Sequence, residues 1–175
     1  AFKAFSNLLD KSTTEAAKEA FNQTIKNVVE NDDLKTIPFR PVVLGGDDFT
    51  GIIRGDLALN FTENFLESFE RLSKENFKDY ANEFNLNENP FNNGLTACAG
   101  IAYIKASYPF HYGVSLAESL CQEAKKHSKE INKEHSPSSL MFHKVQSSFV
   151  EEFDDIIESE LKAKDNIYFN YGPYF

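Results

Sequence analysis

The four residues Gly45, Gly46, Asp47 and Asp48 form the stretch of this sequence whose types are best suited to chemistry. Glycines tolerate a positive φ angle and leave room for a ligand's phosphates to approach the backbone. The two adjacent carboxylates offer hard oxygen donors of the kind that Mg²⁺ prefers, with substrate phosphates completing the coordination shell. Gly and Asp also dominate ordinary turns, so the tetrapeptide alone leaves a metal site and a plain turn equally open.

Within this tetrapeptide, we expect Asp47 to be the leading metal ligand. Neighbouring side chains in a strand point to opposite faces, so Asp47 and Asp48 are not expected to serve one ion symmetrically. A site for two metal ions would require another carboxylate from an adjacent strand.

A second candidate feature is a cluster of lysines in residues 105–144, which carry six Lys against four Glu in a chain of net charge −9. A lysine that contacts phosphate fits this segment, and Lys125 and Lys126 are its adjacent pair. Charge alone favours the simpler interpretation, a solvated helix face.

Other catalytic arrangements find no support in the residue spacing. No Ser–His–Asp or Cys–His arrangement can be argued. Cys98 and Cys121 lie in apolar stretches without a metal or redox spacing, and we interpret them as buried thiols. The histidines lack metal-ligand spacing and are interpreted as surface or strand residues: His111, His127, His135 and His143.

Composition limits the class of protein. With 175 residues, 41% of them hydrophobic, and with 17 Phe and 7 Tyr, the chain is expected to form a single domain over 1–175. A net charge of −9 argues against a diffuse basic surface for nucleic acid. The apolar run 95–104 is far shorter than the ~20 residues of a membrane span, and no secretory signal is visible, so we expect a cytoplasmic protein that does not enter membranes.

The elements that must position these residues follow from hydrophobic periodicity. Two β-prone runs flank the glycines and predict a β-hairpin over 42–54. Capping boxes at Ser12–Glu15 and Ser115–Glu118 predict two helix starts, and Asp56 is expected to cap a third helix. The other expected elements are a helix over 13–30, a loop over 82–94, strands over 95–105 and 139–145, an acidic helix over 150–161 and an aromatic tail over 167–175. The order predicts an α+β fold with a mainly antiparallel sheet covered by helices.

Two segments carry a family resemblance: "IPFRPVVLGGDDFTGIIRGDLALNF" and "GLTACAGIAYIKASYPFHYGVSLAESLCQEAKK". They resemble the second palm domain of the large polymerase-like subunit of type III CRISPR effector complexes, a distant relative of GGDEF nucleotide cyclases. The resemblance covers about residues 38–145, and the ending "YGPYF" resembles that domain more weakly. It implies a ferredoxin-like palm, within a larger protein, in which the GGDD hairpin binds Mg²⁺ or Mn²⁺ and a nucleoside triphosphate.

The same resemblance implies roles for individual residues. Asp47 and Asp48 match the catalytic, metal-binding aspartates, Gly45 and Gly46 match the nucleotide-binding turn, and Lys125 is similar to a lysine that contacts phosphates. The implied reaction joins ATP into cyclic oligoadenylates by attack of a 3′-hydroxyl on an α-phosphate. The implied partners are effector subunits, guide RNA bound through other domains, and a second copy of the chain in a homodimer.

The sequence departs from the family pattern in one place, because the strand that precedes the first helix in that family is missing before Ala1. Two alternatives therefore stay open. One is a catalytically inactive palm that acts as a nucleotide sensor or interaction scaffold, for which the aromatic tail and the acidic helix offer surfaces. The other is a cyclase that makes dinucleotides from GTP, although Asp48 stands where those cyclases usually carry Glu.

Overall fold

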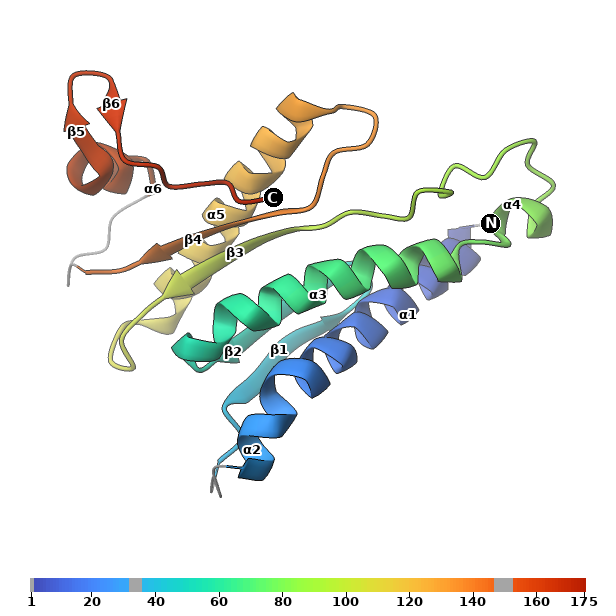
Figure 1. Ribbon diagram of the computed structural model, residues 1–175, viewed down its shortest axis with the longest axis horizontal. Helices are drawn as coiled ribbons and strands as arrows, with labels where there is room; N and C mark the ends of the chain where they lie inside the picture. The colour runs from blue at the N-terminus through green and yellow to red at the C-terminus, as the bar shows by residue number, and fades with distance from the viewer. Residues whose placement is uncertain (1, 32–35, 147–152) are drawn as a thin grey trace. The chain divides into compact units, whose positions relative to one another are not determined.

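The computed structural model describes residues 2–31, 36–146 and 153–175, and its internal contacts divide the chain into two units, Ala1–Thr96 and Ala97–Phe175. Both units contain helices and strands, which confirms the predicted α+β class (Figure 1). That residues 1–175 form one palm-like domain stays a prediction.

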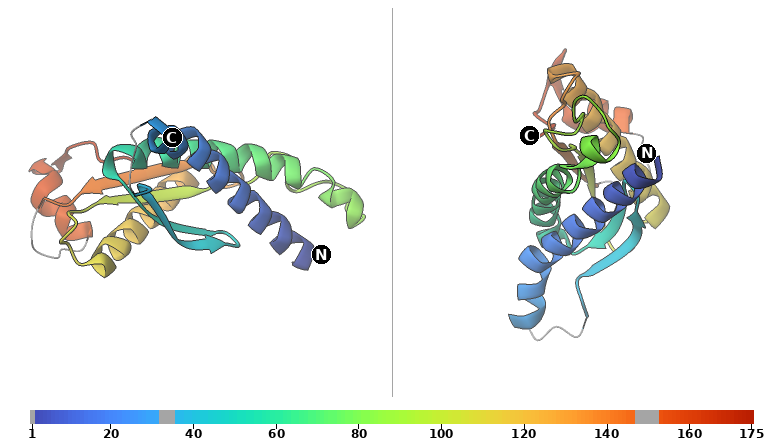
Figure 2. Two further views of the ribbon diagram at one scale, coloured as in Figure 1. Left: turned by 90° about the horizontal axis from the view of Figure 1, so that it is seen from below. Right: turned by 90° about the vertical axis from the view of Figure 1, so that its right-hand side faces the viewer.

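The first unit consists of one β-hairpin and helices that pack on it. Helix α1 packs against α3 (Figure 2). The buried core cluster of this unit comes from α1, η1 and α3: Ala20, Ile25, Leu57 and Phe61. The elements are α1 (Phe2–Phe21), a π-helical turn η1 (Asn22–Lys26), α2 (Asn27–Asn31), β1 (Phe39–Gly45), β2 (Asp48–Ile53), α3 (Gly55–Asn76) and α4 (Tyr80–Glu83).

Small residues on α1 allow it to approach α3 closely. Ala16 and Ala20 are fully buried, and Phe61 of α3 is 1% exposed. The rings of Phe39 and Phe49, one from each strand, lie 5.1 and 5.6 Å from the ring of Phe61. The predicted apolar stripe of α3 is therefore the core beneath the hairpin, and it fixes the hairpin to the helices.

The predicted hairpin is confirmed, with β1 and β2 paired antiparallel from Phe39 opposite Ile53 to Gly45 opposite Asp48. The register shifts between Pro41 and Val43, so one residue of β1 bulges out of the ladder.

Two predicted caps in this unit are wrong. Ser12 lies inside α1, where its hydroxyl donates to the carbonyl of Leu8 (2.8 Å). The helix extends further towards the N-terminus because the ring of Phe5 packs on Phe77 and Phe91.

Asp56 does not cap α3 either. Its two carboxylate oxygens accept hydrogen bonds from the Arg54 guanidinium at 2.7 and 2.9 Å, and such a charge-assisted pair competes with a backbone cap. The residue at the N-cap position is Arg54, without a side-chain capping bond.

The second unit contains a β–α–β arrangement followed by a C-terminal hairpin. Strands β3 and β4 pair in parallel, with Cys98 opposite Ser139, and α5 makes the crossover that parallel strands require. The sequence predicted a mainly antiparallel sheet. The pairs β1–β2 and β5–β6 are antiparallel, and β3–β4 is a parallel pair that the sequence analysis did not foresee. The elements are β3 (Cys98–Tyr103), α5 (Phe110–Ile131), β4 (Ser139–Lys144), α6 (Phe153–Ile156), a π-helical turn η2 (Ile157–Leu161), β5 (Lys162–Lys164) and β6 (Ile167–Tyr168).

Helix α5 also starts earlier than predicted. Pro109 occupies its N-cap position, so Ser115 is an interior residue of the helix and not a cap. Proline suits a helix start because its φ angle is already close to the helical value.

The predicted acidic helix over 150–161 is replaced by α6 and η2, and Val150 lies outside the described residues. The aromatic tail adds β6 and a bridge in which Leu140 and Tyr174 exchange two backbone hydrogen bonds of 2.9 Å.

The two cysteines are free thiols and are partly rather than fully buried. The Cys121 thiol lies 3.2 Å from the Cys98 carbonyl, a contact that joins α5 to β3. Among the described residues, no helix is both long and apolar enough to cross a membrane.

Candidate functional site

The GGDD turn (Gly45–Asp48) is the two-residue tip of the β1–β2 hairpin. Gly45 and Asp48 form the last strand pair, so Gly46 and Asp47 are the two central residues of the turn. Gly46 has a φ of +62°, and a positive φ at the first central residue is the pattern of a type II′ turn. The glycine is therefore required by the backbone at this position.

Both aspartates of the turn are solvent-exposed. Asp47 lies at the tip and Asp48 is the first residue of β2. The two carboxylates are thus available to a ligand from solvent, and they come from different local structures, the turn and the start of a strand.

Helix α1 holds the turn at two atoms of Gly46. The Gly46 amide donates a hydrogen bond of 2.8 Å to Oδ1 of Asp10. The Thr13 hydroxyl donates a hydrogen bond of 2.8 Å to the Gly46 carbonyl. Gly45 also faces Asp10, since a Cβ built on Gly45 would lie 3.6 Å from the same oxygen.

The donor set at the turn consists of oxygen atoms only. Within the described parts of the chain, no group of three or more His, Cys, Asp or Glu side chains is arranged to hold a metal ion. Asp47 and Asp48 alone would therefore leave most of a coordination shell to water and to a ligand. That is the usual situation of Mg²⁺, which is commonly bound by one or two carboxylates plus substrate phosphates.

Lys125 belongs to the second unit and lies on the exposed side of α5. The opposite side of the helix carries Leu120 and Ala124, both fully buried, so the lysine face points to solvent. An open depression of about 390 Å³ follows this face, lined by Gln122, Lys125, Lys126, Lys129, Glu130 and Lys133.

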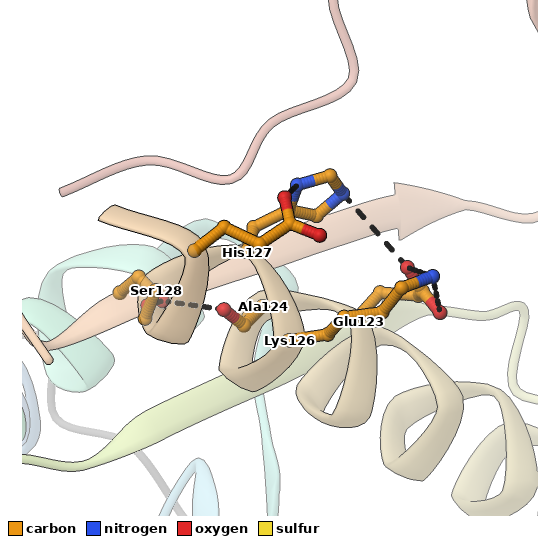
Figure 3. Close-up of polar contacts among 7 residues, drawn as sticks. Glu123, Ala124, Lys126, His127 and Ser128 are labelled. Carbon is orange, nitrogen blue, oxygen red and sulfur yellow. Dashed lines mark hydrogen bonds and ion pairs between the residues drawn. The ribbon is translucent and has the colours of Figure 1, made fainter. Parts of the chain in front are cut away.

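Two side chains close to Lys125 in the sequence contact the same carboxylate. Figure 3 shows Lys126 and His127 beside Glu123, with the Lys126 ammonium 3.4 Å and the His127 Nε2 3.8 Å from its carboxylate. In the described residues, no ion pair to Lys125 is found. Its ammonium group is thus available to an anion from solvent.

Residue spacing did not identify Asp10 or Thr13. Thr13 was included in a predicted capping box, and Asp10 was not singled out. Both contact a residue more than thirty positions away in the sequence, at separations of 33 and 36 residues. The sequence offers no local signal for such contacts; the only hint is that Asp10 is the single aspartate of α1.

In a comparison with protein-family models, residues 2–134 match the family "Cas10/Cmr2, second palm domain". No curated protein matches this sequence significantly. The matched residues include the whole hairpin, α1, α3, β3 and α5, and so both the GGDD turn and Lys125.

Proposed function

Because the chain belongs to the family of the Cas10/Cmr2 second palm domain, which is part of type III CRISPR effector complexes, we propose that its GGDD turn binds ATP together with Mg²⁺ or Mn²⁺. The match confirms the resemblance and the palm fold expected from the sequence. Palm domains of this family generally use divalent metals.

The observation that carries this proposal is the exposure of Asp47 and Asp48 at a turn whose central glycine is held by α1. Two exposed carboxylates fit a divalent ion that takes its other ligands from water and phosphate. Bound there, the ion would neutralise charge on the polyphosphate and polarise the reacting phosphoryl group.

The residues of the chain would contribute binding and orientation. Asp47 and Asp48 would hold the ion, with Asp47 as the leading ligand. Gly45 and Gly46 would leave space for the phosphates, because neither carries a side chain. That Lys125, on α5 of the second unit, contacts phosphates stays a prediction from the resemblance. Phosphoryl transfer depends mainly on such positioning and charge neutralisation.

For the full-length protein we propose nucleotidyl transfer to cyclic oligoadenylates. The 3′-oxygen of one ATP forms a bond to the α-phosphorus of another, the bond from that phosphorus to the bridging oxygen breaks, and pyrophosphate leaves. The proton of the hydroxyl passes to solvent. The proposed partners are the other effector subunits and, through other domains, guide RNA; a homodimer, a cytoplasmic location and a GTP-specific dinucleotide cyclase stay predictions.

A second candidate function has an observation of its own. Since no group of three or more His, Cys, Asp or Glu side chains in the described residues is arranged to hold a metal ion, a palm that binds nucleotide without converting it also fits this donor set. Such a palm would act as a sensor or as a scaffold for protein contacts.

The test is calorimetry of the full-length protein with ATP, with and without Mn²⁺, on the wild type and on Asp47→Ala. We expect binding that requires Mn²⁺ and is lost in the variant. Asp79→Ala is the matched control, because Asp79 is an exposed aspartate of the same unit without a side-chain capping bond. Loss of binding in both variants, or ATP binding that is indifferent to Mn²⁺ and to Asp47, would contradict the proposal.

Conversion of labelled ATP separates the two candidate functions. A product that carries several adenylates and is absent in Asp47→Ala supports the transferase. Metal-dependent binding without any product supports the non-catalytic palm.

A further inference from the structure

Gly46 is held at both of its backbone polar atoms by side chains from one turn of α1. Asp10 accepts from its amide, and Thr13 donates to its carbonyl. Asp10 and Thr13 are three residues apart and therefore lie on the same side of the helix. Two directional contacts to one residue restrict the position and the orientation of the peptide planes on both sides of Gly46.

We propose that Asp10 and Thr13 are positioning residues of the site, which fix the GGDD turn so that Asp47 and Asp48 are already oriented for a metal–nucleotide ligand. This inference rests on the proposed function. Neither residue is assigned a contact with the ligand; both act through Gly46.

The hairpin alone does not provide this rigidity. Its last strand pair is Gly45 with Asp48, so Gly46 and Asp47 lie beyond the ladder. Glycine loses more conformational entropy on ordering than any other residue, and an isolated two-stranded hairpin is marginally stable in water. The two hydrogen bonds from α1 therefore add a constraint at the tip that the strand ladder does not supply.

Helix α1 is a suitable support because its own position is fixed. Thr13 is 1% exposed, and Ala16 and Ala20 on the same helix are fully buried against the core of the unit. Because the Thr13 side chain is itself buried and held in place, its hydrogen bond restricts the motion of the Gly46 carbonyl. The contact transfers the rigidity of the helix layer to the exposed turn.

A different interpretation of the contact between Asp10 and Gly46 predicts the opposite change in the affinity for ATP. Backbone amides of glycine-rich turns bind anions, so the Asp10 carboxylate on the Gly46 amide could be a substitute for a phosphate that must displace it. The bond from Thr13 argues for the support, because the Gly46 carbonyl is an acceptor and has no role in binding phosphate. The two interpretations differ in the sign of the change in affinity when Asp10 is removed.

Conservative variants separate the hydrogen bond from other effects. Asp10→Asn keeps an oxygen that accepts from Gly46 and removes the charge, whereas Asp10→Ala removes both. Thr13→Ser keeps the hydroxyl, and Thr13→Val replaces it at nearly constant volume. Glu63→Ala is the charge control, because Glu63 is exposed on α3 and makes no ion pair in the described part of the chain.

The experiment measures two quantities on the full-length protein: hydrogen–deuterium exchange of the peptide that contains Gly46, and the affinity for ATP with Mn²⁺ by calorimetry. We expect faster exchange and about tenfold weaker binding in Asp10→Ala and Thr13→Val. We expect Asp10→Asn, Thr13→Ser and Glu63→Ala to stay close to the wild type in both quantities. The rescue by Asn and Ser distinguishes positioning from a general loss of stability.

Tighter ATP binding in Asp10→Ala would overturn the inference in favour of the phosphate substitute, and unchanged exchange and affinity would overturn it outright. If the wild type binds no ATP, the proposed function fails, and exchange alone then decides on the support. Equal exchange of the Gly46 peptide in Asp10→Ala and Asp10→Asn would then contradict the proposed support. Faster exchange in Asp10→Ala than in Asp10→Asn would agree with it.

Discussion

The hydroxyl of Thr13 donates to the carbonyl of Gly46 at 2.8 Å, across 33 residues of sequence, while it also lies 3.1 Å from the carbonyl of Leu9 in its own helix. A hydroxyl carries a single proton, so these two acceptors share it, and the shorter contact is the one to the turn. The Thr13 hydroxyl thus bonds less strongly to the Leu9 carbonyl of its own helix, because it also bonds to the Gly46 carbonyl of the turn. The geometry of the GGDD turn is for this reason a property of the whole first unit.

Replacement of Gly46 tests the turn conformation. A Cβ at this position would meet no atom within 4 Å, so the cost comes from the backbone alone, whose φ is +62°. We expect Gly46→Ala to lower the free energy of unfolding by about 1–2 kcal/mol. Gly45→Ala is the matched control and should cost less, because Gly45 has no positive φ and its Cβ would make only an ordinary contact, 3.6 Å from Asp10. Urea denaturation measures both, and equal losses would contradict the assignment of the cost to φ.

Replacement of Lys125 tests the proposed phosphate contact. We expect Lys125→Ala to weaken ATP binding several-fold, and to weaken AMP binding less, since the charge acts on the polyphosphate. Lys105→Ala is the control, because Lys105 is also exposed in the second unit and lies outside the depression on α5. The same loss for ATP in both variants would indicate a general effect of net charge instead of a contact.

The ion pair at the start of α3 predicts a pH dependence of stability. The hydrogen bond from Arg54, together with its charge, lowers the pKa of Asp56 below its usual value. A lowered pKa in the folded state contributes stability above the unfolded pKa of about 3.9, and this contribution is lost as the pH falls through the folded pKa.

Asp56→Asn should therefore lower the urea midpoint at pH 6 and have no effect well below pH 3. The effect should be small, because the pair is exposed to solvent. Asp79→Asn, which removes an aspartate without a side-chain capping bond, should leave the pH dependence unchanged. A midpoint of Asp56→Asn that parallels the wild type at every pH would disprove the role of this pair.

Two glycines of the second unit make opposite predictions. A Cβ on Gly100 of β3 would collide with the backbone of Ala117 and Cys121 in α5, which cannot move without separating the helix from the strand. We expect Gly100→Ala to cost about 3 kcal/mol or more. Gly113→Ala would meet only the end of the flexible Ile104 side chain, and alanine favours the helix, so its effect should stay within about 1 kcal/mol. Thermal denaturation distinguishes the two.

Local patterns were sufficient for the hairpin and for the long helices. The glycine-rich break between two β-prone runs located the GGDD turn, since a turn of this kind requires a residue that accepts a positive φ. The apolar stripe through Phe61 and Phe69 located the core face of α3. Both patterns depend on residues that are close in the sequence, and for that reason they predicted the local structure correctly.

Local patterns failed where a distant contact competes with them. The Ser12 capping box is overridden because Phe5 finds Phe77 and Phe91 to pack on, which extends α1 past the predicted start. The Asp56 cap is overridden by the bond to Arg54. In each case the predicted cap residue makes another contact instead, to the Leu8 carbonyl for Ser12 and to the Arg54 guanidinium for Asp56.

The sequence by itself determined that two adjacent carboxylates stand at a tight glycine turn between strands, and that helices carry apolar stripes to cover it. Only the tertiary structure decided that α1 brings Asp10 and Thr13 to Gly46, and that β3 and β4 pair in parallel around α5. The physical reason is distance along the chain. Turn and helix preferences depend on neighbouring residues, whereas these contacts join residues that meet only after the core has brought their elements together.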